Sequence, residues 1–279
     1  MGVEIHCPAS GLNGLQWHAD STGVPRVNLH GWLDNAASFR VLVPKLSPRP
    51  TLALDLPGHG HSPWKGEGAD YAIWNYTAEL SACLATYSEP VDLIAHSMGA
   101  SAALCLAAAF PELVRSLVLL DSPGPIVTPE NAIARQLREG VDAQNKDKSP
   151  RVIATEDDAL AIRQKATPFI PEDALRAMVQ RNLVATSGGF LWRTDPRLKL
   201  ASKLRLTEGQ VNGLMQAVSC PVLAIRAGSG MIPPQMFEQR MAYLPNVRKE
   251  TVAGHHHFHM EDEAATEIAR LVEEFQESL

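Results

Sequence analysis

The chain has 279 residues, of which 45% are hydrophobic and 20% charged, and its formal net charge at pH 7 is −6. A chain of this length can bury one large core and can carry an inserted subdomain. No stripe of Lys and Arg stands out, which argues against a nucleic-acid-binding protein. The most apolar region, 93–120, is interrupted by His96, Pro111, Glu112 and Arg115, so no membrane span is expected.

Targeting and cofactor signals are equally scarce. The first ten residues carry no basic segment followed by an apolar one, so we expect no secretory signal and a cytoplasmic protein. The four cysteines lack paired spacing, and Cys83, Cys105 and Cys220 are expected to be small core residues in a reducing compartment. No nucleotide-binding loop or other cofactor motif occurs, so no cofactor is expected. The oligomeric state is not indicated.

Apolar strand patterns alternate with helical patterns along most of the chain. We expect strands at 3–7, 14–19, 26–30, 51–55, 91–95, 114–121, 221–228 and 246–254, and helices at 71–87, 99–110 and 261–279. This alternation predicts a mostly parallel central sheet covered by helices on both faces. The stretch 122–217 is instead charged and helical. We therefore predict an α/β core made of 1–121 and 218–279, with an inserted helical cap at 122–217.

Polar residues follow several of these strands. Trp32 comes just after the third strand, Ser97 after "DLIA", Asp121 after "LVLL", and three consecutive histidines including His256 after "KETV". Because the carboxyl ends of parallel strands meet at one edge of a sheet, these residues are expected to gather there. Ser, then an acid, then His is the chain order of α/β-hydrolase triads.

The stretch "AHSMGA" predicts a sharp turn from a strand into a helix, with Ser97 at its tip. Such a turn displays the Ser hydroxyl to a base and a substrate, and it needs small neighbours, here Ala95 and Gly99. The backbone N–H of Met98, at the start of the helix, can stabilise an oxyanion. The alternative is that Ser97 only caps the helix. The motifs on either side favour the catalytic interpretation.

Five segments together resemble the α/β-hydrolase superfamily; they read "LHGWLDNAASF", "ALDLPGHGHS", "AHSMGA", "LVLLDSP" and "VAGHHHFHME". The "HGWLDNA" loop and the "RTDPRL" stretch are similar to its serine hydrolase-like branch. The resemblance implies an α/β-hydrolase fold and a Ser–His–Asp triad. It also implies that the backbone N–H of Trp32 is the second oxyanion donor and that the Trp32 ring lines the pocket.

The acid and the base need separate assignments. Many family members carry the acid after the next-to-last strand, but here that loop reads "AGSGMIPPQMF". We therefore assign the acid to Asp121, and a Ser–His dyad or an acid from the cap stays open. Alignment of "VAGHHHFHME" on a Gly-x-His-x-x-His pattern makes His256 the base; a register shift of one residue would promote His255. Three consecutive histidines are not expected to converge on one metal ion, so no metal is expected.

These features predict a serine hydrolase of the carboxylesterase type that cleaves a small-molecule ester through an acyl-enzyme. Phe169, Phe190 and Trp192 of the cap are candidate substrate-binding residues beside Trp32. The same scaffold supports thioesterases, carbon–carbon bond hydrolases, perhydrolases and a cofactor-free dioxygenase. A catalytically silent ligand-binding protein is the non-enzymatic alternative. The sequence does not specify the acyl or alcohol group.

Overall fold

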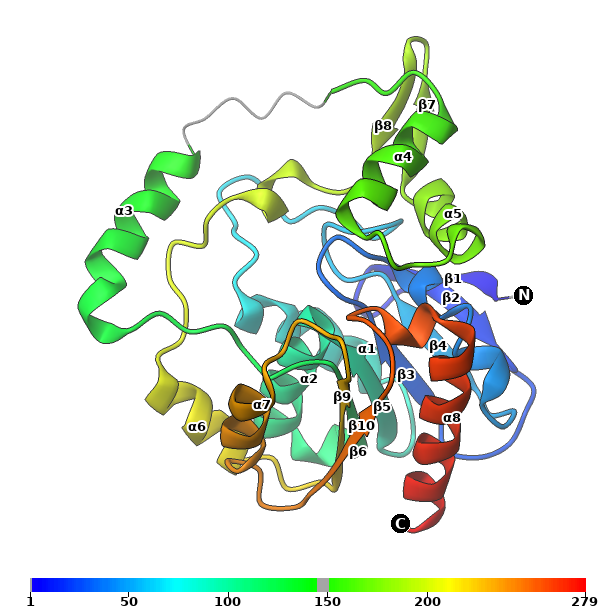
Figure 1. Cartoon of the computed structure of the whole chain (residues 1–279), viewed down its shortest axis with the longest axis vertical. Coiled ribbons are helices and arrows are strands. Elements are labelled where there is room, and N and C mark those ends of the chain that lie inside the picture. The colour runs from blue at the N-terminus through cyan, green and yellow to red at the C-terminus, as the bar shows by residue number, and fades with distance from the viewer. Residues whose placement is uncertain (1, 145–150) are drawn as a thin grey trace.

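The computed structural model describes residues 2–144 and 151–279 (Figure 1). Within these residues one large sheet contains, in spatial order, β1 (Val3–Cys7), β2 (Leu12–Trp17), β4 (Thr51–Leu54), β3 (Arg26–Leu29), β5 (Val91–His96), β6 (Val114–Leu120), β9 (Val222–Ala227) and β10 (Val247–Val252). Strand β2 is antiparallel to both of its neighbours, and the remaining pairs are parallel. The predicted mostly parallel sheet is confirmed.

Helices cover both faces of the sheet (Figure 1). The helices α1 (Thr77–Leu84), α2 (Met98–Ala109), α6 (Glu208–Gln216) and α7 (Pro234–Met241) contribute to one apolar cluster, and α8 (Asp262–Glu277) contributes to the other. Successive residues of the central strands alternate between the two clusters, as Leu93 and Ile94 of β5 do. Because both faces are covered, parts of these strands are apolar at successive positions, such as Leu93–Ala95 of β5 and Leu117–Leu120 of β6.

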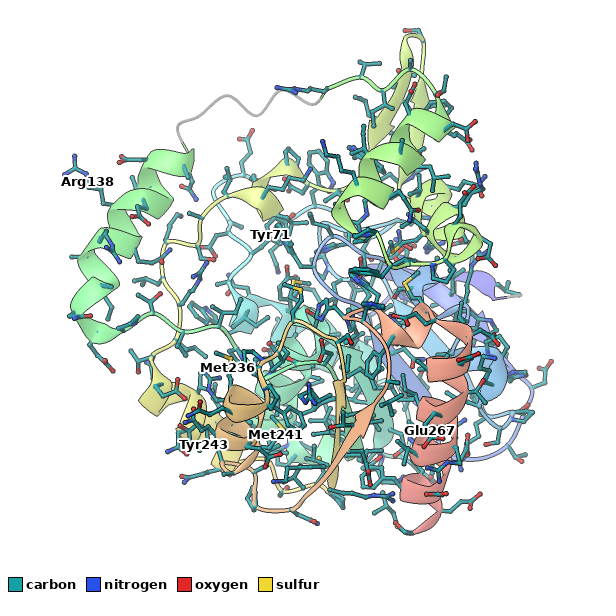
Figure 2. All side chains as sticks on the ribbon, in the orientation of Figure 1. Tyr71, Arg138, Met236, Met241, Tyr243 and Glu267 are labelled. Carbon is teal, nitrogen blue, oxygen red and sulfur yellow. The ribbon has the colours of Figure 1, made fainter. Side chains whose placement is uncertain are left out.

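The segment between β6 and β9 leaves the sheet and returns to it. It contains α3 (Ile133–Gln144), α4 (Glu156–Ala166), α5 (Glu172–Arg181), α6 and a hairpin of β7 (Leu183–Thr186) and β8 (Gly189–Trp192). Helices α4 and α6 each begin with a capping box, at Thr155 and Thr207. In Figure 1, α4, α5 and the hairpin lie together, whereas α3 stands apart, and Arg138 on α3 points away from the rest of the molecule in Figure 2.

The hairpin and the position of α6 are details that the sequence patterns did not indicate. Val211 and Met215 of α6 belong to the same apolar cluster as α2, although they fall inside 122–217. The division into a core and an inserted cap therefore stays a prediction. No helix in the described ranges is long and apolar enough to cross a membrane.

Candidate active site

Ser97 occupies a strained turn between β5 and α2. Its φ of 51° and ψ of −114° lie in a region that non-glycine residues rarely adopt. Its backbone N–H donates to the carbonyl of Leu120 at 3.0 Å, which fixes the turn to the neighbouring strand. A Cβ on Gly99 would lie 2.4 Å from the carbonyl oxygen of Leu29, so glycine is what lets α2 pack this closely against β3. Ala95 is fully buried and still fits beside β3 and β6.

His256 connects Ser97 to Asp121. Its Nε2 lies 3.0 Å from Ser97 Oγ, and its Nδ1 lies 2.6 Å from Asp121 Oδ2. Since a carboxylate only accepts hydrogen bonds, Nδ1 carries the hydrogen and the Nε2 lone pair faces the Ser97 hydroxyl. In this tautomer the imidazole can accept a proton from that hydroxyl.

Backbone donors from the loop after β9 hold Asp121 in place. The N–H of Ala227 donates to Oδ1 at 3.0 Å, and the N–H of Met231 lies 3.3 Å from Oδ2. A Cβ on Gly230 would lie 2.4 Å from Oδ2, so this position leaves room only for glycine. The loop that lacks an acid in the sequence therefore contributes backbone N–H groups to the acid of β6.

The other two histidines of the base loop point elsewhere. The His255 ring stacks on Phe169 with ring centroids 3.8 Å apart, and its backbone N–H donates to Glu261 Oε1 at 2.8 Å. His257 Nε2 lies 3.2 Å from Asp34 Oδ2. Of the three, His256 is the one that the structure brings to Ser97 and Asp121.

Buried titratable groups lie behind Ser97. Burial lowers the pKa of His96 well below its usual value and lowers that of His259 to about 3, so both rings are neutral at pH 7. For Asp34, burial alone would raise the pKa, but the adjacent His257 and Arg163 hold it well below its usual range. Asp34 is thus an anion. Among the described residues, Asp34, His96 and His257 form a group that could hold a metal ion.

Of the two residues expected to supply backbone donors for an oxyanion, Met98 follows Ser97 directly and Trp32 lies in the loop after β3, the strand beside β5. Met98 is the first residue of α2, where backbone N–H groups have no acceptor within the helix. Trp32 lies in the loop after β3, and its ring is 52% exposed. The Trp32 indole Nε1 donates to the carbonyl of Leu198 at 3.0 Å.

The "RTDPRL" stretch, which ends at Leu198, is held by hydrogen bonds to the loop between β4 and α1. Asp195 begins the short helix η6 (Pro196–Lys199), and its carboxylate accepts from the N–H of Arg197 at 2.9 Å and from the Tyr71 hydroxyl at 2.6 Å. Its own N–H donates to the carbonyl of Gly58 at 2.8 Å. These bonds fasten η6 to the loop between β4 and α1.

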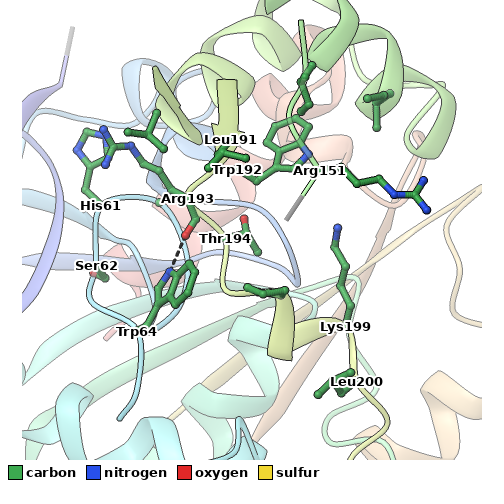
Figure 3. A pocket seen from close by; sticks show the side chains of 15 residues that line it. His61, Ser62, Trp64, Arg151, Leu191, Trp192, Arg193, Thr194, Lys199 and Leu200 are labelled. Atoms are coloured by element: carbon green, nitrogen blue, oxygen red, sulfur yellow. Dashed lines mark hydrogen bonds between the residues drawn. The ribbon is translucent and has the colours of Figure 1, made fainter. Parts of the chain in front are cut away.

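Two cavities adjoin these elements. The larger has a volume of about 820 Å³ and is lined by Trp64, Trp192, Arg193 and Lys199 among others (Figure 3). The Trp64 indole donates to the carbonyl of Arg193 at 2.6 Å, the dashed line in Figure 3. The sequence analysis did not single out Trp64 as a pocket residue. The available signal was a Trp in a Gly- and Pro-rich loop. None of the described lining residues belongs to the Ser97–His256–Asp121 group.

The smaller cavity has a volume of about 240 Å³ and adjoins the Ser97–His256–Asp121 group. His256 lines it together with Phe169, Met231 and His257. Phe169 and Trp192 therefore line different cavities. Phe190 is not among the described lining residues of either cavity; it packs against the apolar cluster on the α8 face and pairs through its backbone with Ile153.

The fold and this site agree with the comparison to known proteins. Residues 29–271 match the alpha/beta hydrolase family, and the chain belongs to that family. It is 31% identical over 278 residues to a probable serine hydrolase of Drosophila melanogaster, covering 93% of this chain and 84% of that protein. It is 28% identical over 272 residues to an esterase of Mycobacterium tuberculosis, covering 94% and 86% of the two chains.

A solved structure is also similar to this chain in fold and in sequence. The crystal structure of a hypothetical protein from Pseudomonas aeruginosa PAO1 matches with a TM-score of 0.88 and 34% sequence identity, and the match covers 98% of both chains. The α/β-hydrolase fold and the likeness to serine hydrolases that the sequence motifs predicted are confirmed.

Proposed function

We propose that this hydrolase is a serine esterase of the carboxylesterase type, which cleaves a small-molecule ester through an acyl-enzyme on Ser97. The observation that supports it most is the continuous chain of hydrogen bonds from Asp121 through His256 to Ser97, with distances of 2.6 Å and 3.0 Å. The similarity to an esterase over most of the chain supports the ester as the bond that is cleaved.

The reaction follows from these positions. Ser97 Oγ attacks the acyl carbonyl while His256 Nε2 takes its proton, and the nearby Asp121 carboxylate stabilises the resulting imidazolium. His256 then gives the proton to the departing alkoxide, which leaves an acyl-enzyme. Water attacks this ester while His256 takes its proton; the bond to Ser97 Oγ then breaks, His256 returns the proton to Ser97, and the acid product is released.

The negative charge on the carbonyl oxygen needs donors that are already in place. We assign them to the backbone N–H groups of Trp32 and Met98, which lie in the loop after β3 and at the start of α2. One such donor contributes about 10²–10³-fold to kcat in a protease studied by mutagenesis. Their position on rigid element ends supports this role.

The acyl or alcohol group would contact the residues around the smaller cavity. Its volume of about 240 Å³ and its lining by Phe169 and His256 suit a small apolar group next to the base. Trp192 and Trp32 would contact the remainder of the substrate. Phe190 lies two residues before Trp192 on β8, and both pack against the same apolar cluster; we propose that Phe190 supports the pocket.

The test compares the wild-type enzyme with Ser97→Ala on p-nitrophenyl esters and matched thioesters of graded chain length. Loss of a triad nucleophile reduces kcat by about a millionfold in a well-studied protease, and a comparable loss is expected here. Ser81→Ala, at a half-buried position of α1, is the control and should keep full activity. Circular dichroism confirms the fold of both variants. Near-wild-type turnover by folded Ser97→Ala would refute the proposal.

A further inference from the structure

Three side chains next to the triad converge from different parts of the chain. Asp34 lies in the loop after β3, His96 ends β5, and His257 lies in the loop after β10. Their ligand atoms lie within 4.8 Å of one another. Asp34 Oδ2 is 3.2 Å from His257 Nε2 and 3.7 Å from His96 Nδ1. Ligands of one tetrahedral zinc ion, each about 2.0–2.1 Å from it, are separated by roughly 3.4 Å.

His96 is left with an unsatisfied nitrogen in this cluster. Its Nε2 lies 2.8 Å from the carbonyl oxygen of His256, which only accepts, so Nε2 carries the hydrogen and Nδ1 is a lone pair. Nδ1 is buried and has no hydrogen-bond partner among the described residues. The fully buried His96 therefore points an acceptor at a fully buried carboxylate. Two buried acceptors facing one another are unfavourable unless a cation lies between them.

Gly31 keeps the space beside these two atoms open. A Cβ at this position would lie 2.7 Å from His96 Nδ1 and 2.9 Å from Asp34 Oδ2. Any side chain there would fill the region next to both acceptors. The glycine of the loop after β3 thus leaves room for a small occupant.

We propose that Asp34, His96 and His257 bind a divalent transition-metal ion, with Zn²⁺ as the best match. Two imidazole nitrogens and one carboxylate oxygen form a donor set typical of zinc. The ligands are themselves oriented, since Arg163 Nη2 donates to Asp34 Oδ1 at 2.9 Å and His96 Nε2 donates to the His256 carbonyl. His257 also lines the smaller cavity, which gives the ion a route of entry.

This site is not a cluster of the three consecutive histidines, which were not expected to bind one metal ion together. The three consecutive histidines do not converge, and only His257 takes part. Of the other two ligands, Asp34 lies in the loop after β3 and His96 is the last residue of β5, both distant in sequence. A bound ion would join the end of β5 to the loops after β3 and β10, so it would stabilise the folded protein against heat.

The experiment titrates the chelator-treated full chain with ZnCl₂ by calorimetry and with CoCl₂ by visible absorption, which reports tetrahedral coordination. His257→Ala is compared with His255→Ala, its neighbour in the same loop, which stacks on Phe169 instead. We expect one zinc ion per chain and a higher melting temperature in the wild type and in His255→Ala. In His257→Ala the affinity should fall by at least about tenfold, the lower end of what even an outer partner contributes.

Melting curves without metal establish that both variants fold; if His257→Ala does not, His257→Gln replaces it. The proposal is overturned if the wild type binds zinc no more tightly than about 1 mM. It is overturned equally if His257→Ala binds zinc as the wild type does, or if His255→Ala loses binding to the same extent. Hydrolytic activity does not enter the test, so its outcome is independent of the proposed esterase function.

Discussion

The loops at the carboxyl edge of the sheet and the segment that lies over them are built differently. At the edge, the Asp121 side chain is fully buried, the His256 side chain is 16% exposed, and each has at least one hydrogen-bond partner on another strand or loop. Over the sheet, Phe169 is 60% exposed and Lys199 is also exposed. The residues of the proposed triad are thus buried and hydrogen-bonded, whereas Phe169, a candidate substrate-binding residue, lies on an exposed segment.

The two regions are nevertheless tied together at a few buried points. Arg181 of α5 donates to the fully buried Asp55 at 2.7 Å, and Asn35 Nδ2 donates to the carbonyl of Met178 at 2.8 Å. The Trp32 indole reaches Leu198 in the same way. Substitutions in the overlying segment should therefore change substrate preference without disturbing the fold only when they leave these anchors intact.

The largest effect that separates the two regions is expected from the base. His256→Ala should reduce kcat by about a millionfold, as removal of a triad histidine does in a protease. His255→Asn, one residue earlier, should keep substantial activity because the His255 ring stacks on Phe169 rather than facing Ser97. Initial rates of the two variants, assayed side by side, measure the difference. An active His256→Ala variant together with an inactive His255→Asn variant would show that the base is His255 and not His256.

A smaller but still large effect is expected from the acid. Asp121→Asn should lower kcat by about ten-thousandfold, because an amide in this place favours the wrong tautomer of His256. The fold should survive, since Asn is isosteric with Asp. Stopped assays on one activated ester give the rate. If most of kcat remains, Asp121 only braces the loop and the enzyme works as a dyad or with another acid.

An intermediate effect is expected where a backbone loop positions the acid. Gly230→Ala places a Cβ 2.4 Å from Asp121 Oδ2 and must displace the carboxylate or the loop. A misplacement of about 1 Å can cost about a hundredfold in rate, so kcat should fall by roughly 10–100-fold. Gly213→Ala, where no atom lies within 4 Å of the added Cβ, is the matched control and should be silent. Equal rates in the two variants would show that this loop does not position Asp121.

The sheet was predictable because its strands are buried on both faces and read as apolar runs such as "VDLIA" and "LVLL". Ser97 and Asp121 could be singled out because each follows one of these runs, and His256 because it lies in a histidine-rich loop after the last strand. The structure brings them within hydrogen-bond distance, and their catalytic roles stay predictions. The support from Ala227 and Met231 could not be predicted, since backbone N–H groups leave no side-chain signal. The β7–β8 hairpin was missed because three of the four residues of β7 are exposed and its apolar pattern is short.

The smallest effect is expected in the overlying segment. Trp192→Ala and Phe169→Ala should change kcat/KM by about 3–30-fold, in different directions for short and long esters, because hydrophobic contacts discriminate modestly. The chemistry should be preserved, so the rate of Ser97 acylation by a very small ester should stay near that of the wild type. Trp74→Ala, an exposed Trp on the short helix before α1, is the control. A thousandfold loss on every ester would place these residues in the catalytic machinery instead.

The proposed mechanism depends most on Ser97 as the nucleophile, and covalent labelling tests this role directly. The intact enzyme is treated with a fluorophosphonate, and the modified peptide is identified by mass spectrometry. We predict a single adduct on Ser97, labelling that is much slower in His256→Ala, and no adduct in Ser97→Ala. An unlabelled wild-type enzyme, or an adduct on another serine that persists in Ser97→Ala, would contradict the account.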